Sequence, residues 1–429
     1  MKVALVHFRA GFTDGVSLEM EKWKRVLEGL GHEVIYVAGE FDRVEGVEIS
    51  SISMKNEENF WIHGNAFERL SVDEEAFQRR FEGYAEAIKN ELEEKMPQVD
   101  LLIVNNIFSL GFNLAAAVAL ARWAREKDVK ILAHHHDFYW ERERYSRPQC
   151  GFVRRVLEEY FPPKGEKIRH VTINRLAQKE LFQRKGIESM VVPNVFDFDQ
   201  VAWQIDEYND DLRSKLGIGK DLFVLHATRI VPRKAIEIAM DFTARLCEMV
   251  ESKVHFVVAG FPEEESQDYY RKIVEKSKRM PYETHFVFDM VRSERSMDGR
   301  KYYSLWDMYA VCDIVTYTSV LEGWGNQLIE AVFARKPLVV FEYPVYKSDI
   351  APVGFEFISL GDVAHYDVAE GFYKVDESKL EAAARRLKDL ISEPEKLSKI
   401  VQKNFEIGKK HLSLQSLRER LEQILKTLK

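Results

Sequence analysis

Short apolar runs alternate with longer amphipathic segments along this chain, and this alternation limits the fold more than any other feature. Residues 3–6 and 34–37 are uninterrupted apolar runs, and the segment between them has helical periodicity from Ser17 until Gly31 ends it. Runs without polar residues are typical of parallel strands that are covered on both faces. The chain therefore opens with a βαβ unit, which predicts a doubly wound sheet.

The same alternation occurs twice, on either side of a turn-rich segment at 193–199. It predicts an α/β fold with two Rossmann-like doubly wound domains facing a central cleft. Ligands of such folds bind beyond the carboxyl ends of the strands, so we expect a two-substrate reaction in this cleft. The expected domains are 1–195, which binds an acceptor, 196–400, and a C-terminal helix in 401–429 that packs back towards the first domain. The expected strands are 3–6, 34–37, 101–104, 130–133, 171–173 and 190–192, then 222–226, 255–259, 285–288, 314–317, 338–341 and 357–359.

Composition excludes several classes of protein. The net charge of −8 disfavours a nucleic-acid-binding protein. Cys150, Cys247 and Cys312 form no CxxC pair, so neither a disulfide framework nor a zinc site is expected, and a reducing cytoplasm suits them. No apolar run reaches about 18 residues, and the first run is too short for a signal peptide, so we expect no transmembrane segment.

Two basic residues follow the expected strand 222–226. Arg229 and Lys234 stand just before a helix, where backbone N–H groups and the helix dipole also favour negative charge. Together they could converge on a diphosphate. The alternative is a solvated basic turn.

Two acidic residues, Glu322 and Glu330, flank a glycine-containing loop. Gly323 and Gly325 would let the backbone approach a ligand, and Asn326 is suited to cap the next helix. Carboxylates accept hydrogen bonds from neighbouring sugar hydroxyls. The alternative is a turn followed by a helix with a surface glutamate.

Three consecutive histidines end the strand 130–133. In an extended segment His134 and His136 share one face and His135 the other, so one imidazole could face the cleft. A metal site formed with Asp137 is the rival interpretation, but no further histidine or cysteine has the spacing to complete it.

These motifs, in this order, resemble retaining glycosyltransferase family 4, which has the GT-B fold. The R-x4-K pair, the E-x7-E pair, the first loop at 14–17 and the segment 192–197 carry the resemblance, which spans nearly the whole chain. The resemblance implies a hexosyltransferase that uses a nucleotide-diphosphate sugar. The sequence departs from the family at Asp14, where many relatives have glycine, and at Trp324, where phenylalanine is common.

The resemblance also implies roles for individual residues. Arg229 and Lys234 would bind the donor diphosphate, Glu322 the sugar and Glu330 the ribose. Further donor contacts would come from the 323–326 backbone, and His136 would hydrogen-bond the donor sugar. The predicted catalytic residues are Glu322, His136, Arg229 and Lys234, and the predicted donor-binding residues are Glu330, Gly323, Trp324, Gly325, Asn326 and Gly15.

The acceptor is expected in the first half. Residues 134–145 are similar to enzymes that make compatible solutes of the mannosylglucosylglycerate type and, more loosely, to trehalose-forming synthases, which implies a small polar or anionic acceptor. Residues 150–190 contain nine Lys or Arg and five Glu, which gives a local charge of +4. This charge could attract an anionic acceptor or an anionic membrane face. The predicted acceptor-binding residues are Asp14, Arg142, Arg144 and Tyr145.

No metal or other cofactor is expected to be essential, although Mg²⁺ is not excluded. The D-x-D triplet at 197–199 resembles a metal motif of another transferase fold, but its position favours coincidence.

The alternative functions are transfer to a lipid or polysaccharide acceptor at a membrane face, a phosphorylase or epimerase, and a non-catalytic nucleotide-sugar-binding protein. The sequence leaves the oligomeric state open, a homo-oligomer included.

Overall fold

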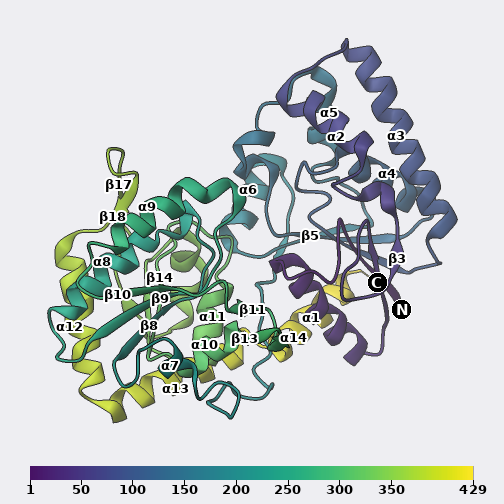
Figure 1. Ribbon diagram of the computed structural model, residues 1–429. Helices are drawn as coiled ribbons and strands as arrows, with labels where there is room; N and C mark the ends of the chain where they lie inside the picture. Colours follow the sequence, from purple (N-terminus) through teal and green to yellow (C-terminus); the bar gives the residue numbers. More distant parts are fainter. Residues whose placement is uncertain (429) are drawn as a thin grey trace. The chain divides into compact units, whose positions relative to one another are not determined.

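The computed structural model describes residues 1–428, and its contacts divide them into two compact units (Figure 1). The first unit contains Met1–Val195 and residues 414–428, and the second contains Phe196–Ser413. Each is an α/β unit built on its own parallel sheet. The α/β class and the two Rossmann-like units predicted from the sequence are confirmed.

The sheet of the first unit has seven parallel strands in the order β3-β2-β1-β4-β5-β6-β7. The chain first builds outwards from β1 to β3 and then returns to the other side of β1. The point between β1 and β4 is therefore a topological switch point, where α/β sheets bind ligands. The strands are β1 (Lys2–His7), β2 (Glu33–Ala38), β3 (Val47–Glu48), β4 (Leu101–Asn105), β5 (Lys130–His135), β6 (Ile168–Thr172) and β7 (Met190–Val191).

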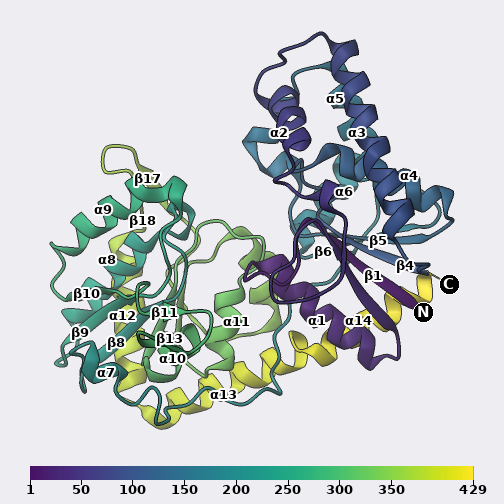
Figure 2. The same cartoon turned by 45° about the vertical axis from the view of Figure 1, so that its right-hand side comes forward.

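Helices cover both faces of this sheet, because alternate residues of each strand point to opposite sides. Val3 and Leu5 of β1 belong to the core under α1 (Gly15–Gly29) and α14 (Leu414–Thr427), which lie together in both views (Figure 2). Ala4 and Val6 belong to the opposite core. That core is covered by α3 (Glu74–Lys95), α4 (Leu114–Glu126) and α5 (Gly151–Tyr160). The other helical segments are η1 (Ser50–Ile52), α2 (Glu57–His63), η2 (Gly64–Glu68), η3 (Tyr139–Glu141), η4 (Glu143–Tyr145) and α6 (Arg175–Lys185).

The second unit repeats this plan with six parallel strands in the order β10-β9-β8-β14-β15-β16. Its switch point lies between β8 and β14. The strands of the main sheet are β8 (Leu222–His226), β9 (Val254–Val258), β10 (Glu283–Phe286), β14 (Ile314–Tyr317), β15 (Leu338–Val340) and β16 (Ile358–Ser359). Two small sheets contain β11 (Val291–Arg292), β12 (Ser296–Asp298) and β13 (Arg300–Ser304), and β17 (His365–Asp367) with β18 (Phe372–Lys374).

The helices of the second unit connect these strands, as crossovers between parallel strands must. Helices α8 and α12 pack against each other. The full set is α7 (Leu212–Lys215), η5 (Pro232–Lys234), α8 (Ile236–Cys247), η6 (Glu264–Ser266), α9 (Gln267–Ser277), α10 (Leu305–Val311), α11 (Asn326–Phe333), η7 (Tyr346–Ile350), η8 (Ala351–Val353), α12 (Glu377–Ile391) and α13 (Pro394–His411).

The ends of the elements differ from the sequence-based expectations in identifiable places. Helix α1 begins at Gly15 instead of Ser17, because the Asp14 carboxylate accepts hydrogen bonds from the Val16 and Ser17 amides and caps it. The expected single stretch 395–427 is two helices that end and begin around 412–413. Residues 401–413 belong to the second unit and 414–428 to the first, whereas the sequence analysis grouped 401–429 together. Helix α5 and the two small sheets were not predicted from the sequence.

No helix within residues 1–428 is both long and apolar enough to cross a membrane.

The packing of α14 gives a first prediction. Leu421 is fully buried in the core that also contains Trp23 and Leu27 of α1. Leu421→Ala should lower the free energy of unfolding by about 2–5 kcal/mol, because the lost burial leaves a cavity. Gln423→Ala, at an exposed position of the same helix, should change it by less than about 0.5 kcal/mol. Urea unfolding followed by circular dichroism measures both, and equal effects would contradict the assignment of α14 to this core.

Candidate active site

The switch point of the second unit brings two sequence motifs together. The segment with Arg229 and Lys234 follows β8, and the segment with Glu322 follows β14, the strand beside β8. The two loops are bound to each other through their backbones: the Val320 amide donates to the Arg233 carbonyl at 2.9 Å, and the Thr318 hydroxyl donates to the Ala235 carbonyl at 2.9 Å. Residues about 90 positions apart in the chain therefore share one site.

Three charged side chains form the centre of this site. The Lys234 ammonium and the Glu322 carboxylate make an ion pair, and both side chains are almost fully buried. The other carboxylate oxygen, Oε2, lies 2.7 Å from Nη1 of the partly exposed Arg233. Burial by itself would raise the pKa of Glu322, but Lys234 and Arg233 outweigh it and hold the pKa below its usual value. The carboxylate is thus ionised, and the trio carries a net charge of +1 that favours an incoming anion.

Arg229 is held at the edge of this loop. Its exposed guanidinium pairs with Glu263. The loop passes so close to Gly260, two residues after β9, that a Cβ there would collide with the Thr228 carbonyl. Arg229 and Lys234 thus lie in one loop, as the sequence indicates, but each has a different carboxylate partner.

The loop from Glu322 to Glu330 turns into α11 at a glycine. Gly325 has φ +156°, and a Cβ there would collide with the hydroxyl of Tyr343, which donates to the Trp324 carbonyl at 2.5 Å. The expectation that Asn326 caps this helix is wrong, because Gly325 is the N-cap residue and Asn326 is the first helical residue. The Trp324 side chain is buried.

Glu330 lies inside the first turns of α11. Its side chain is largely buried, and its Oε2 atom accepts a hydrogen bond from the Tyr309 hydroxyl at 3.0 Å. Tyr309 therefore fixes the orientation of this carboxylate, which sequence reasoning alone did not indicate.

The three consecutive histidines of the first unit point to two sides, as the strand geometry predicts. The rings of His134 and His136 are 4.1 Å apart on one face, whereas His135 Nε2 lies 3.0 Å from His170 Nδ1 on the other. His134 stacks on Trp23, so it is part of the core. His136 is the first residue after β5, at the carboxyl end of the sheet.

His136 is neutral at ordinary pH. Burial is the main cause that lowers its pKa to about 3, and the positive charge of His7 adds to it. Its amide donates to Asn106 Oδ1 at 2.8 Å, and its Nε2 lies 3.4 Å from Asn105 Oδ1. Asn105 is the last residue of β4 and Asn106 is the next residue; neither was identified from the sequence, and together they hold the histidine beside the switch point.

The first loop lies at the same edge of that sheet. Asp14 caps α1 and also forms an ion pair with Arg9, at 3.0 Å between Oδ2 and Nε. Burial opposes its ionisation, but the Ser17 amide and Arg9 outweigh burial and lower its pKa. Gly15 is the exposed first residue of the helix. The N-terminus of α1 is therefore already capped by the Asp14 carboxylate.

The residues expected to bind an acceptor occupy different environments. Arg142 forms an ion pair with Asp137 at 2.7 Å, and Arg144 lies over the ring of Tyr145, which is fully buried. A cavity of about 410 Å³ borders Tyr145, but Arg142 and Arg144 are not among the residues that line it. The lining residues are Tyr139, Trp140, Tyr145, Ser146, Pro148, Arg154, Leu157, Glu158, Arg184 and Lys185.

Sequence reasoning missed Arg233, which makes the second ion pair of Glu322. Its position beside Lys234 could have suggested this role. Asp199 of the D-x-D triplet pairs with Lys409 at 2.7 Å.

The chain is similar to known proteins over nearly its whole length. Residues 209–406 match the family model described as "Glycosyl transferases group 1". The chain is 41% identical to a mannosylglucosylglycerate synthase of Petrotoga mobilis over 95% of its length and 97% of the relative. It is 38% identical to a mannosylglucosylglycerate synthase of Thermotoga maritima over 99% of both chains.

Solved structures show the same fold at much lower identity. Anabaena Alr3699/HepE, crystallised with UDP and glucose, has a TM-score of 0.62 and 15% identity over the whole of both chains. An α,α-trehalose 6-phosphate synthase from Burkholderia multivorans has a TM-score of 0.62 and 12% identity over 100% of this chain and 96% of the other.

The fold, the loops at the switch point and the family match define a GT-B glycosyltransferase. The chain belongs to the group 1 glycosyltransferases, in the same family as the two mannosylglucosylglycerate synthases.

The close approach at Gly325 can be tested directly. Gly325→Ala should displace the loop between Glu322 and α11, because the new methyl group meets the Tyr343 hydroxyl. We expect glycosyl transfer to fall at least tenfold. The double variant with Tyr343→Phe, which removes that hydroxyl, should recover part of the loss in a kinetic assay. A single variant with unchanged kcat/KM would contradict the steric requirement.

The neutral His136 predicts a pH dependence of stability. Its pKa is lower in the folded state than in the unfolded chain, so the unfolded state binds more protons as the pH falls below about 6.5. Stability should be complete above that pH and decrease as the pH falls towards 3. Urea unfolding of His136→Gln between pH 7 and 5 should show a shallower decrease than the wild type. His365→Gln, at an exposed position, should keep the wild-type slope; identical slopes for all three proteins would refute the explanation.

Proposed function

We propose that this glycosyltransferase makes mannosylglucosylglycerate by moving a mannosyl group, with retention of configuration, from a nucleotide-diphosphate sugar to a glucosylglycerate acceptor. Full-length identity of 38–41% to two synthases of that name supports the product. The observation that carries the transfer chemistry is the buried Lys234–Glu322 pair beside Arg233.

The cations of the second unit supply electrostatic stabilisation. When the bond between the sugar carbon and the β-phosphate oxygen breaks, negative charge grows on the leaving diphosphate. Lys234, Arg233 and Arg229 would stabilise that charge, and preorganised positive groups in a dry site are the strongest contributors to such catalysis. The loop backbone at 323–326 would contact the same phosphate and sugar oxygens.

The acidic residues would position the donor. Glu322, ionised between its two cations, can accept hydrogen bonds from the sugar hydroxyls. Glu330, oriented by Tyr309, can accept both ribose hydroxyls. His136, being neutral, can form a hydrogen bond with a sugar hydroxyl without placing a second positive charge near the anomeric carbon. Trp324 would complete the wall, and Gly15 would let the first loop approach the phosphate.

The reaction balances without an added base. The acceptor oxygen bonds to the anomeric carbon on the face from which the diphosphate leaves, and the departing β-phosphate takes the acceptor proton. No metal ion is required in this scheme, because lysine and arginine provide the positive charge that a Mg²⁺ ion would otherwise supply. The scheme therefore predicts that glycosyl transfer continues undiminished in excess EDTA.

We place the acceptor in the first unit, where a cavity would suit a small anion. The cavity beside Tyr145 is lined by three cationic residues, Arg154, Arg184 and Lys185, against one acidic residue, Glu158, and its aromatic surface comes from Tyr139 and Trp140. Cations attract a glycerate carboxylate, and aromatic rings stack on sugar faces. Asp14, Arg142 and Arg144 remain the proposed contacts from the neighbouring loops. A small soluble acceptor agrees with a cytoplasmic enzyme.

Substitution of the buried lysine tests the donor site. Lys234→Ala should lower kcat/KM by about 10²–10³-fold, because one preorganised cation is lost and Glu322 is left with less compensation. Lys399→Ala, at an exposed position of α13, is the matched control and should leave transfer unchanged. The assay supplies glucosylglycerate with mannose donors that differ in their base, and mass spectrometry identifies the product.

The outcomes separate the alternatives. Mannosylglucosylglycerate formed by the wild type, and lost in Lys234→Ala, supports the proposal. Transfer only to a lipid or polysaccharide acceptor would overturn the acceptor, and sugar epimerisation would overturn the reaction. Donor binding without any turnover would indicate a non-catalytic binding protein; a donor at 100 times its Kd stabilises the fold by about 2.7 kcal/mol in a thermal-shift assay.

A further inference from the structure

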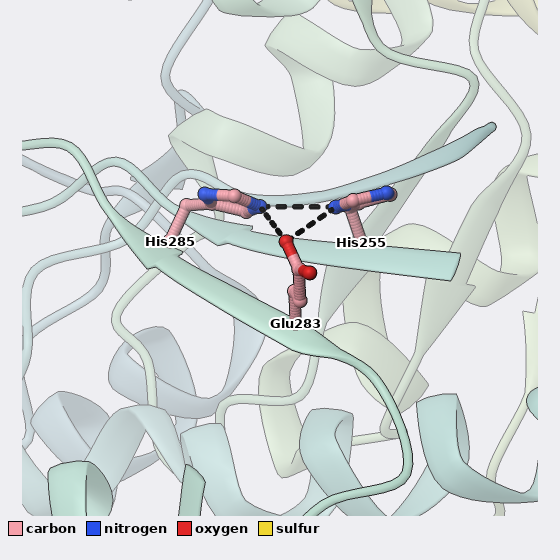
Figure 3. Close-up of side chains that lie close together, drawn as sticks. All are labelled: His255, Glu283 and His285. Atoms are coloured by element: carbon pink, nitrogen blue, oxygen red, sulfur yellow. Dashed lines mark hydrogen bonds and ion pairs between the residues drawn. The ribbon is translucent and has the colours of Figure 1, made fainter. Parts of the chain in front are cut away.

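Two histidines and a glutamate meet in the second sheet (Figure 3). They lie at the end of the sheet opposite to the loops after β8 and β14, residues 227–235 and 318–325, which we call the donor loops. His255 is the second residue of β9 and pairs in register with Glu283, the first residue of the edge strand β10. His285 is two residues after Glu283, so both side chains point to the same face of β10. The donor loops leave the carboxyl ends of the same sheet, whereas this cluster lies near the amino ends.

The three side chains direct one atom each towards a common point. His255 Nδ1 lies 3.0 Å from His285 Nε2 and 3.7 Å from Glu283 Oε2, and the last two atoms are 3.9 Å apart. Ligands about 2.0–2.1 Å from a tetrahedral zinc ion are separated by about 3.3–3.4 Å. The three atoms therefore need to move by only a few tenths of an ångström to surround one ion.

A further carboxylate orients the central histidine. Asp221, the residue before β8, has its Oδ2 atom 3.2 Å from His255 Nε2. If Nε2 carries the proton for this contact, the lone pair of Nδ1 faces Glu283 and His285. Metal-binding histidines usually have this kind of carboxylate partner, which fixes the tautomer and the ring orientation.

A simple hydrogen bond between two histidines explains less of this arrangement. His135 and His170 form such a pair at the same 3.0 Å separation, but without a carboxylate. In residues 1–428, His255, Glu283 and His285 are the group of three potential ligands that satisfies the geometry for a shared ion. Glu283 is three-quarters exposed, so its carboxylate can turn towards a cation bound beside the two histidines.

We propose that His255, Glu283 and His285 bind a zinc ion, with water in the fourth position and Asp221 as the positioning residue. Two imidazoles and a carboxylate are ligands that zinc accepts, and the two carboxylates balance its charge. The ion would join the edge strand β10 to β9 and stabilise this end of the sheet. This site is separate from the donor loops and does not depend on the proposed function.

Metal binding by the intact protein tests the site. Metals are first removed with a chelator, and the protein is exchanged into chelator-free buffer. After zinc is added and the excess removed, the wild type should retain one zinc ion per chain, measured by elemental analysis. Added zinc should raise its Tm by a few degrees, because the ion binds the folded state. Co²⁺ should give the visible absorption of tetrahedral coordination, which a hydrogen-bonded histidine pair cannot produce.

Variants distinguish this site from adventitious binding. His285→Ala should abolish the stoichiometric zinc and the Co²⁺ spectrum, and Asp221→Asn should weaken zinc affinity on the order of 10–100-fold while keeping the spectrum at saturation. His365→Ala, which removes an exposed histidine from β17 of the same unit, should bind zinc as the wild type does. Circular dichroism confirms that each variant is folded. Absence of zinc from the wild type at micromolar concentrations, or equal binding by His285→Ala, would overturn the proposal.

Discussion

The ion pair between Lys234 and Glu322 is the interaction on which the second unit's site depends. Burying two charges is costly unless they compensate each other, and removing one partner leaves the other uncompensated. The pair therefore holds the loop after β8 against the loop after β14, with Arg233 as an additional cation. The same excess positive charge that keeps the carboxylate ionised makes the site receptive to a diphosphate.

Both units use the switch point of a doubly wound sheet, but with different chemistry. The second unit places cations and carboxylates there, which suits a charged donor. The first unit places His136, held by Asn105 and Asn106, where burial keeps the ring neutral. In the proposed reaction, the neutral histidine would suit an uncharged sugar, and the cations of the second unit would suit a charged leaving group.

The zinc site proposed at the other end of the second sheet would have a structural task. Edge strands have one unpaired side, and β10 is the edge of its sheet. A metal ion there would strengthen the edge without contacting the donor loops, so stability and chemistry would be controlled at opposite ends of the same short strands.

The sequence by itself determined the fold class, and it predicted residues for the candidate site. Periodicity identified all six strands of the second main sheet to within about two residues, because buried parallel strands are local apolar runs. The sequence also predicted Arg229, Lys234, Glu322 and Glu330 as donor-site residues, through motif spacing and the resemblance to a glycosyltransferase family. Only the tertiary structure decided which side chains are partners. The Lys234–Glu322 pair, the Tyr309–Glu330 hydrogen bond and the His255–His285 contact join residues 88, 21 and 30 positions apart. Such contacts follow from strand order and register, which a linear pattern does not contain.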